Sequence, residues 1–311
     1  LADGSHASRG DLSEWSASPA VRDWRRRFSG GNIGLCCREN SYLALALLLL
    51  DGVAARITLL PAALDSDALV SLAHSAGITC LVSDWIETPP PELNVADPIP
   101  TLQLGLSGHQ TEHFTDAYPT EWVLPTSGTT RTPKLVAHTV GTLTKSVKRD
   151  ASKGADLCWG LLYDLNRFAG IQVYLQALLG GASLAIPNAD VTLDQKLAFF
   201  AQAGCNAISA TPTLWRKILM TPGAREIPLK LITLGGEIAD QSILSALKNA
   251  FPLARVTHIY ASTEAGVGFS VTDGLEGFPA SYLIAPLSSA TLRISKDGIL
   301  EIQPLISGQK Y

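Results

Sequence analysis

Short apolar runs alternate with amphipathic stretches along most of the chain. Runs of four to six apolar or β-branched residues predict buried strands, and the stretches of about ten residues between them predict helices. In the first third, strands are predicted over 32–37, 55–60 and 79–83, and helices over 41–50 and 66–76. Short apolar strands separated by helices are typical of a parallel sheet covered on both faces, so the pattern predicts an α/β fold.

A proline-rich stretch interrupts this alternation. The segment 87–100 (ETPPPELNVADPIP) holds five prolines, which neither continue a helix nor donate to a central strand. We expect a surface connection there, and subdomains at about 1–95, 100–270 and 271–311. In the second block, strands are predicted over 121–125, 183–186, 207–210, 229–234 and 255–260. One helix is predicted to begin at about 141, another to end at 179, and three more to span 193–203, 212–219 and 242–250.

From residue 271 the pattern changes to short strands and turns. Strands are predicted over 290–295 and 299–303, joined at Asp297-Gly298, because Asp-Gly between strands is a strong hairpin signal. The predicted architecture is two packed mixed or parallel α/β subdomains plus a small β-rich subdomain. The triplet Arg25-Arg26-Arg27 is expected on a solvated helix face.

Composition narrows the class of protein. The 311 residues include 24 Lys and Arg against 28 Asp and Glu, a net charge of −4, which excludes a generally basic nucleic-acid-coating protein. Hydrophobic residues make up 46% and charged residues 17%, as expected for a soluble globular protein. The most apolar run, 42–50, is about half of the ~20 residues that cross a bilayer, so no membrane span is expected. The first residues show no targeting signal, and we expect a cytoplasmic protein.

The cysteines support that location. They are odd in number and lack a CxxC spacing, so small buried thiols in a reducing cytosol explain them better than metal ligands or disulfides. The five are Cys36, Cys37, Cys80, Cys158 and Cys205.

The segment 125–135 (PTSGTTRTPKL) places five hydroxyls, one glycine and one lysine directly after a predicted strand. Hydroxyls and backbone N–H groups freed by a glycine can surround phosphate oxygens, and a lysine adds positive charge. The residues concerned are Thr126, Ser127, Gly128, Thr129, Thr130 and Lys134. An ordinary polar turn is the alternative. A P-loop is excluded, because Pro133 precedes the lysine and Leu135 follows it.

This loop resembles the signature TSGTTG-x-PK of the adenylate-forming superfamily, which comprises acyl-CoA synthetases, peptide-synthetase adenylation domains and luciferases. Three further motifs follow in the family's order. They are Thr211-Pro212-Thr213, Gly235-Gly236-Glu237 after the predicted strand LITL, and Tyr260-Ala261-Ser262-Thr263-Glu264, which is similar to the family's Y-G-x-T-E. Because the residue pattern of 32–64 also resembles the N-terminal half of the family, the resemblance covers essentially the whole chain.

The resemblance implies ATP- and Mg²⁺-dependent activation of a small carboxylic acid to an acyl-adenylate, with release of pyrophosphate. A thiol of coenzyme A or of a carrier-protein phosphopantetheine then takes the acyl group, so an acyl carrier protein is an expected partner. The resemblance assigns the ATP phosphates to Thr126, Ser127, Gly128, Thr129 and Thr130, adenine to Gly235, Gly236, Glu237 and Tyr260, and catalysis to Thr263, Glu264 and Lys134.

The residue types support two of these assignments independently. Glu264 follows a strand end beside a hydroxyl, which suits a magnesium ligand, and Tyr260 offers an aromatic face. The alternatives are that Glu264 caps a following helix and that Tyr260 packs in the core. His138 and His258 lack a Ser or Cys partner at a recognisable spacing and are expected to be structural.

The chain departs from the family pattern at several places. Arg131 stands where the signature has its last glycine, so the loop is expected either to differ or to gain a phosphate contact. Ala261 replaces a glycine. The family's ribose-binding aspartate, hinge and small C-terminal lid with its catalytic lysine are expected beyond these residues, which correspond to the large domain. The chain is therefore expected to bind nucleotide and acyl-adenylate but to adenylate poorly.

The segment 161–170 (LLYDLNRFAG) stands where the family has the loop that lines its acyl pocket. The predicted pocket residues are Tyr163, Arg167, Phe168, Ala261 and Gly266. Asp164 resembles only faintly the aspartate of amino-acid-activating domains, so an acyl or aryl acid is favoured over an amino acid. A binding module without turnover is the second hypothesis. A dehydrogenase or kinase is excluded by the lack of a dinucleotide fingerprint or P-loop.

Overall fold

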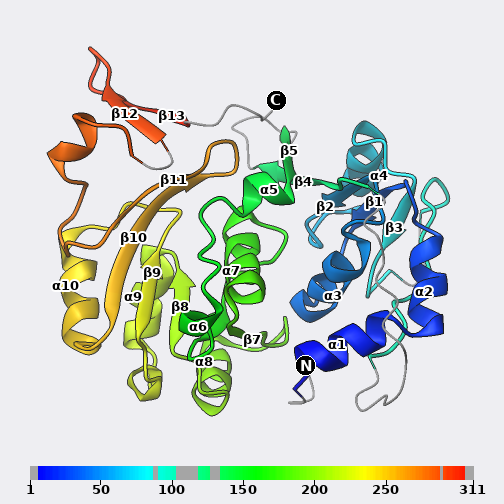
Figure 1. Ribbon diagram of the computed structural model, residues 1–311, viewed down its shortest axis with the longest axis horizontal. Helices are drawn as coiled ribbons and strands as arrows, with labels where there is room; N and C mark the ends of the chain where they lie inside the picture. Colours follow the sequence, from blue (N-terminus) through cyan, green and yellow to red (C-terminus); the bar gives the residue numbers. More distant parts are fainter. Residues whose placement is uncertain (1–5, 87–89, 103–117, 127–133, 288–289, 305–311) are drawn as a thin grey trace. The chain divides into compact units, whose positions relative to one another are not determined.

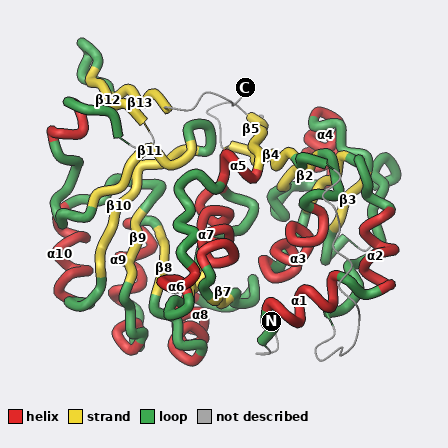
Figure 2. Tube along the Cα trace, viewed as in Figure 1, coloured by secondary structure: helices red, strands yellow, loops and turns green. Residues whose placement is uncertain are grey.

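The computed structural model describes residues 6–86, 90–102, 118–126, 134–287 and 290–304. The chain divides into two compact units, residues 1–140 and 141–310. Each unit has its own β-sheet (Figures 1 and 2).

The first unit is a five-stranded sheet with helices, and it confirms the α/β prediction. Its helices are α1 (Arg9–Ser16), α2 (Pro19–Arg26), α3 (Asn40–Leu50) and α4 (Ser66–Ser75), and its strands are β1 (Asn32–Leu35), β2 (Arg56–Leu59), β3 (Cys80–Val82), β4 (Glu121–Thr126) and β5 (Lys134–Thr139). The strand order is β3-β1-β2-β4-β5. Strands β1 to β4 are parallel, as their apolar runs predict, and β5 joins β4 in the antiparallel direction.

The predicted phosphate loop is the connection of the β4–β5 hairpin. Thr126, the last residue of β4, pairs with Lys134, the first residue of β5. The strand β5 was not predicted, and it places both ends of the loop in neighbouring positions of the sheet. Residues 127–133 themselves lie outside the described part of the chain.

The proline-rich stretch lies within the first unit, where it contacts α2. The indole N–H of Trp24 donates to the carbonyl oxygen of Asp97 (3.0 Å), and the Arg27 guanidinium pairs with the Asp97 carboxylate (2.5 Å). The expected solvated arginine face is wrong for Arg25, which is only 8% exposed, whereas Arg26 and Arg27 are exposed.

The second unit holds the remaining elements. Its helices are α5 (Val140–Leu143), α6 (Ala151–Gly154), α7 (Phe168–Gly180), α8 (Leu193–Gln202), α9 (Pro212–Met220) and α10 (Gln241–Ala250), with 3₁₀ turns at Ala224–Glu226 and Ala280–Leu283. Its strands are β6 (Cys158–Leu161), β7 (Ser183–Ala185), β8 (Ala207–Ala210), β9 (Leu231–Leu234), β10 (Arg255–Ser262), β11 (Gly266–Val271), β12 (Ala290–Ile294) and β13 (Leu300–Pro304).

The six-stranded sheet of this unit reverses its strand order at β6. The order is β11-β10-β9-β8-β6-β7, so the chain leaves β6 for β7 on one side and returns with β8 on the other. Strands β6 to β10 are parallel, and β11 is antiparallel to β10. In open α/β sheets, ligands bind outside the carboxyl ends of the strands at such a reversal.

The core of this unit is apolar and closely packed. Phe200 and Trp215 are completely buried, and the indole N–H of Trp215 donates to the carbonyl oxygen of Thr233 in β9 (2.9 Å). A Cβ at Gly160 would lie 3.0 Å from the Phe200 ring, so a larger residue in β6 would have to displace that ring by a few tenths of an ångström.

Two predictions differ from the structure in detail. The helix predicted from about 141 is the single turn α5, since the hydroxyls that follow make other contacts: Thr144 accepts from Arg149 and Ser146 donates to Gln172. The hairpin predicted at Asp297-Gly298 is confirmed, because β12 and β13 pair in the antiparallel direction and Gly298 has a φ of +78°.

All five cysteines are free thiols. Cys36, Cys37 and Cys205 are buried, and burial raises the pKa of Cys36 to about 11. Cys80 and Cys158 are half-buried, which is less than expected. The Sγ atoms of Cys158 and Cys205 lie 3.6 Å apart.

Candidate functional site

Four segments that carry predicted site residues leave the same edge of the second sheet. Because β6, β8, β9 and β10 are parallel, their carboxyl ends lie together. Tyr163 follows β6, Thr211 follows β8, Gly235 follows β9 and Thr263 follows β10. The topology therefore brings to one edge motifs that are up to 100 positions apart in the sequence.

Direct contacts join three of these segments. The Tyr163 hydroxyl donates to the carbonyl oxygen of Gly235 (3.4 Å). A Cβ at Gly235 would be 3.8 Å from the carbonyl oxygen of Ile259, and a Cβ at Gly236 would be 3.6 Å from Cγ2 of Thr211. The glycine motif thus lies beside the polypeptide of β10 on one side and beside the Thr211 motif on the other.

Tyr163 is held as a protonated donor. Burial raises the pKa of its phenol, and a hydrogen bond with the Ser209 hydroxyl only partly offsets that rise. An uncharged phenol at this position can donate to Gly235 or to a polar group of a ligand.

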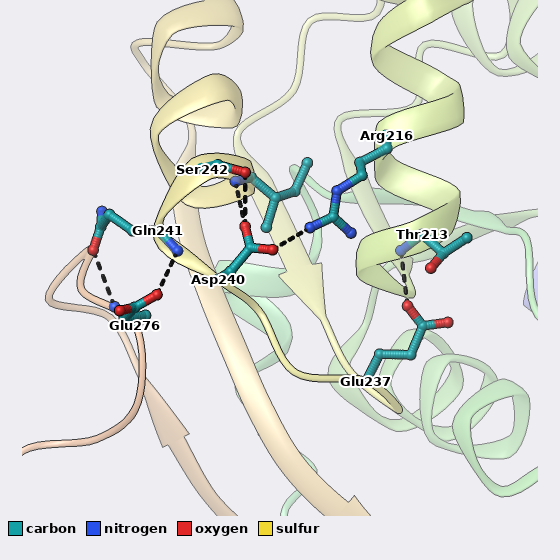
Figure 3. A network of polar contacts seen from close by, with 8 residues as sticks. Thr213, Arg216, Glu237, Asp240, Gln241, Ser242 and Glu276 are labelled. Carbon is teal, nitrogen blue, oxygen red and sulfur yellow. Dashed lines mark hydrogen bonds and ion pairs between the residues drawn. The ribbon is translucent and has the colours of Figure 1, made fainter.

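The Glu237 carboxylate does not project freely into the site. Its Oε2 accepts the backbone N–H of Thr213, the second residue of α9 (2.9 Å; Figure 3). Hydrogen bonds from Thr213, above all from its side chain, lower the pKa of Glu237. Sequence comparison assigns this residue to adenine, whereas the structure places its side chain on the first turn of a neighbouring helix.

A second carboxylate of the same loop also binds α9. Asp240 accepts a hydrogen bond from the Arg216 guanidinium of α9 (2.5 Å), and it caps α10 by accepting the backbone N–H of Ile243 (3.0 Å; Figure 3). The backbone N–H of the next residue, Gln241, donates to the Glu276 carboxylate (2.9 Å). The loop 235–240 is therefore attached to α9 at two points.

Thr263 and Glu264 lie in the tight turn between β10 and β11. The Ser262 hydroxyl accepts the backbone N–H of Ala265 (3.0 Å) and closes the turn. A strand follows, so the alternative in which Glu264 caps a helix is wrong. Glu264 is half-buried, and among the described residues no hydrogen bond or ion pair joins its carboxylate.

Tyr260 presents an aromatic ring at the end of β10. The residue is 47% exposed, so it does not belong to the core, and its ring stacks on Phe269 of β11 with centroids 5.4 Å apart and planes 8° from parallel. Phe269 in turn meets Phe278 and Tyr282 edge-on. Phe269 thus links the Tyr260 ring to two further aromatic rings.

The predicted acyl-pocket residues lie on separate elements. Arg167 is exposed just before α7, and Phe168 is buried as its first residue. Ala261 belongs to β10 and Gly266 opens β11, where these strands pair around an irregular register. Their grouping into one acyl pocket stays a prediction.

The predicted phosphate residues belong to the first unit. Thr126 and Lys134 end and begin the paired strands β4 and β5, and Lys134 is exposed. Ser127, Gly128, Thr129, Thr130 and the unusual Arg131 lie outside the described residues. Their roles stay predictions.

The residues described at the β10–β11 turn suit magnesium. Mg²⁺ takes one or two carboxylates together with phosphate oxygens and water, rather than a cage of protein ligands. Glu264 with the neighbouring hydroxyls of Ser262 and Thr263 supplies hard oxygen atoms of this kind. Within the described ranges, no cluster of three or more His, Cys, Asp or Glu residues could hold a metal by itself.

Among the described residues, no helix is both long and apolar enough to span a bilayer.

Sequence reasoning missed the attachment of the glycine loop to α9. Thr211 followed by Pro212 is a helix-start signal, and Asp240 before an apolar helix is another. Both signals locate a helix start, but neither shows that Glu237, in the loop after β9, binds the first turn of α9.

The sequence is similar to a known protein family and to one curated protein. A family model described as AMP-binding enzyme matches residues 51–297. The nonribosomal peptide synthetase gloA of Glarea lozoyensis is 27% identical over 233 residues, which are 68% of this chain and 3% of that protein.

Two solved structures are similar in fold. The nonribosomal peptide synthetase FmoA3 in its AMPPNP-bound form gives a TM-score of 0.75 at 16% identity, over 94% of this chain and 33% of that one. The o-succinylbenzoate CoA synthetase MenE of Bacillus subtilis, in complex with the acyl-adenylate intermediate OSB-AMP, gives 0.64 at 16% identity, over 93% and 60%. This chain spans less than two thirds of each of the three proteins.

Proposed function

The chain belongs to the family of AMP-binding enzymes, and on that premise we propose that it activates a small carboxylic acid with ATP and Mg²⁺. In the proposed reaction a carboxylate oxygen attacks the α-phosphorus of ATP, the bond to the bridging oxygen breaks, and pyrophosphate leaves. The product is an acyl-adenylate. The protein's part is to hold the two reactants in line and to stabilise the charge on phosphorus, with no side-chain nucleophile.

One observation carries this proposal. The motifs after β6, β8 and β9 meet at the carboxyl edge of the sheet, where the strand order reverses. There the Tyr163 hydroxyl donates to Gly235, and Gly236 lies beside Thr211. Such an edge is where open α/β sheets bind nucleotides.

The turn between β10 and β11 supplies the groups for the α-phosphate and the metal. In this proposal Thr263 donates to the α-phosphate and Glu264 would hold Mg²⁺ through its carboxylate, which no described residue binds. Bound Mg²⁺ supplies positive charge that offsets negative charge on the phosphate oxygens. The half-exposed Tyr260 ring and the backbone of Gly235 and Gly236 receive adenine.

The phosphate loop is proposed to bind the β- and γ-phosphates through backbone N–H groups and hydroxyls. The proposed residues are Thr126, Ser127, Gly128, Thr129, Thr130 and Lys134. Arg131 adds a cation to this loop. It also favours a second candidate function, an adenylate-binding module without turnover, because arginine lacks the conformational freedom of the glycine it replaces.

In a second step, the acyl group of the adenylate is proposed to be transferred to a thiol. Its sulfur attacks the acyl carbonyl carbon, AMP leaves, and the thiol proton passes to solvent. The similarity to a nonribosomal peptide synthetase supports a carrier-protein phosphopantetheine, and the similarity to a CoA synthetase supports coenzyme A. The five free thiols suit the reducing cytoplasm in which we place the enzyme.

The acid is proposed to be an acyl or aryl carboxylate. Phe168 is buried at the start of α7, while the nearby Asp164 is exposed. An amino-acid substrate would instead need a carboxylate placed to receive its ammonium group.

Thermal unfolding with Mg-ATP and with a panel of acyl-sulfamoyl-adenosines tests the proposal. A mimic present at about 100 times its dissociation constant stabilises the folded protein by about 2.7 kcal/mol, and its acyl group identifies the substrate class. We expect Thr263→Ala and Glu264→Ala to reduce this stabilisation. Glu226→Gln, an exposed position in the turn after α9, is the matched control and is expected to keep it.

Turnover separates the two candidate functions. Because the large domain by itself is expected to adenylate poorly, turnover is measured on the chain joined to the family's C-terminal lid domain. Acid-dependent release of pyrophosphate then supports the ligase, whereas binding of a mimic without release supports the binding module. If neither Mg-ATP nor any mimic shifts the unfolding transition, the proposed function is wrong for this chain.

A further inference from the structure

Glu237 belongs to the predicted adenine motif, yet its carboxylate is bound by the protein itself. Its Oε2 accepts the backbone N–H of Thr213 (2.9 Å), and the neighbourhood of Thr213 lowers the pKa of the carboxyl. Figure 3 shows the side chain directed toward the first turn of α9, away from the start of α10.

The first turn of α9 is completed by these contacts. A helix begins with backbone N–H groups that have no partner within the helix, and they attract an anion. In α9, Pro212 has no N–H, Thr213 donates to Glu237, and Leu214 donates to the Thr211 hydroxyl (3.2 Å). Glu237 is thus the anion at this helix start, and the place is not left for a phosphate.

This contact fixes the glycine turn from one side. Gly236 precedes Glu237 directly and has a φ of +81°, a conformation that residues other than glycine rarely adopt. On the other side, the Tyr163 hydroxyl donates to the carbonyl oxygen of Gly235. Four residues after Gly236, Asp240 binds Arg216 of the same helix α9. The turn is therefore held at both ends.

We propose that Glu237 is a positioning residue for nucleotide binding, which acts through α9 and touches neither the nucleotide nor its metal. By joining the loop after β9 to the helix after β8, it fixes the Gly235-Gly236 backbone as a surface for the base of an adenine nucleotide. This inference rests on the proposed function, because it takes the glycine turn as the place of the base.

Ligands that contain only part of ATP test the inference, with affinity measured by calorimetry for the full chain and its variants. Adenosine probes the base surface without phosphate or metal, and inorganic tripolyphosphate with Mg²⁺ probes the phosphate and metal groups without the base. We expect Glu237→Ala to weaken adenosine and Mg-ATP by the same factor, about fivefold for the loss of a helix-capping contact, and to leave Mg-tripolyphosphate unchanged.

The conservative variant separates positioning from metal binding. In Glu237→Gln the amide oxygen still accepts the Thr213 N–H, so adenosine and Mg-ATP affinity are expected to return nearly to wild type. A metal ligand would behave in the opposite way, with Glu237→Gln as weak as Glu237→Ala for Mg-ATP and adenosine unaffected by either. Glu226→Gln is the matched control for loss of an exposed glutamate.

Hydrogen exchange adds a readout that needs no nucleotide. The Thr213 amide is expected to exchange faster in Glu237→Ala, but not in Glu237→Gln or Glu226→Gln. Unchanged exchange in Glu237→Ala would overturn the inference, as would adenosine binding equal to wild type. A wild-type chain that binds neither adenosine nor Mg-ATP would overturn the proposed function, and this inference with it.

Discussion

The loops after β9 and β10 leave the same edge of one sheet, but their acidic residues have opposite surroundings. In the loop 235–240, Glu237 and Asp240 both bind groups of α9. In the β10–β11 turn, no described residue binds the carboxylate of Glu264. A carboxylate bound by its own protein stabilises a loop, whereas one without such a partner is available for a ligand. The comparison therefore assigns a scaffolding role to the acidic residues of the first loop and ligand chemistry to the acidic residue of the second.

The largest expected effect is that of Glu264→Gln, which removes a charge and keeps the shape. We expect acid-dependent pyrophosphate release to fall by about 100-fold or more, as when one electrostatic contact to a transition state is lost. The melting temperature is expected to stay within about 2 °C, because Glu264 has no hydrogen bond or ion pair with another described residue to lose. A large fall in melting temperature would show that Glu264 is structural, and would contradict the difference drawn between the two loops.

The second prediction compares two glycines, one in each loop. Gly236 and Gly266 have φ values of +81° and +72°. Because the left-handed conformation disfavours a Cβ, Gly236→Ala and Gly266→Ala are each expected to destabilise the fold by about 1 kcal/mol in urea unfolding. Adenosine affinity is expected to fall only in Gly236→Ala. An equal loss in both variants would contradict the assignment of the base to the first loop.

The third prediction concerns the ion pair of the first loop. Asp240→Ala removes the cap of α10 and the partner of Arg216, and is expected to lower the melting temperature by about 3 °C. Arg216→Met is expected to have a smaller effect, because both side chains of the pair are more than a third exposed. Calorimetric scans of the two variants measure the difference, and the reverse order would argue that the ion pair, not the cap, fixes the loop.

The smallest expected effect is a pH dependence. Hydrogen bonds in the folded protein, chiefly from Thr213, lower the pKa of Glu237. A carboxyl whose pKa is lower in the folded state adds stability above its ordinary pKa of about 4.3, and this contribution is lost as the pH falls through the folded value. The difference in unfolding free energy between wild type and Glu237→Ala is therefore expected to be constant near neutral pH and to shrink below about pH 4. A difference that grows on acidification would contradict the attachment.

Most of the fold follows from local pattern. The buried parallel strands are short apolar runs, such as LITL in β9, and their helices carry clear start and stop residues. Strands β5 and β6 escaped prediction for physical reasons. The strand β5 (KLVAHT) has polar residues at both ends and gains its hydrogen bonds by pairing with β4. The strand β6 (CWGL) includes Gly160, which disfavours a strand in sequence but lies close against the Phe200 ring.

The meeting of the candidate site segments could be predicted from the sequence, but the contacts of their side chains could not. Motif order alone selects Gly235, Tyr260 and Thr263, and parallel strands bring them to one edge. The partner of Glu237 lies 24 positions earlier, on a helix of another βα unit. No local pattern carries that contact, because it depends on how two loops pack after both strands have formed.

The attachment of Glu237 to α9 also has an evolutionary consequence. The turn between β10 and β11 is a separate connection, so selection can change the proposed metal ligand without changing the other loops. The loops after β8 and β9 share the Glu237 to Thr213 contact. We expect these two loops to be inherited as a pair, so that an exchange of one between relatives succeeds only when the other is exchanged with it.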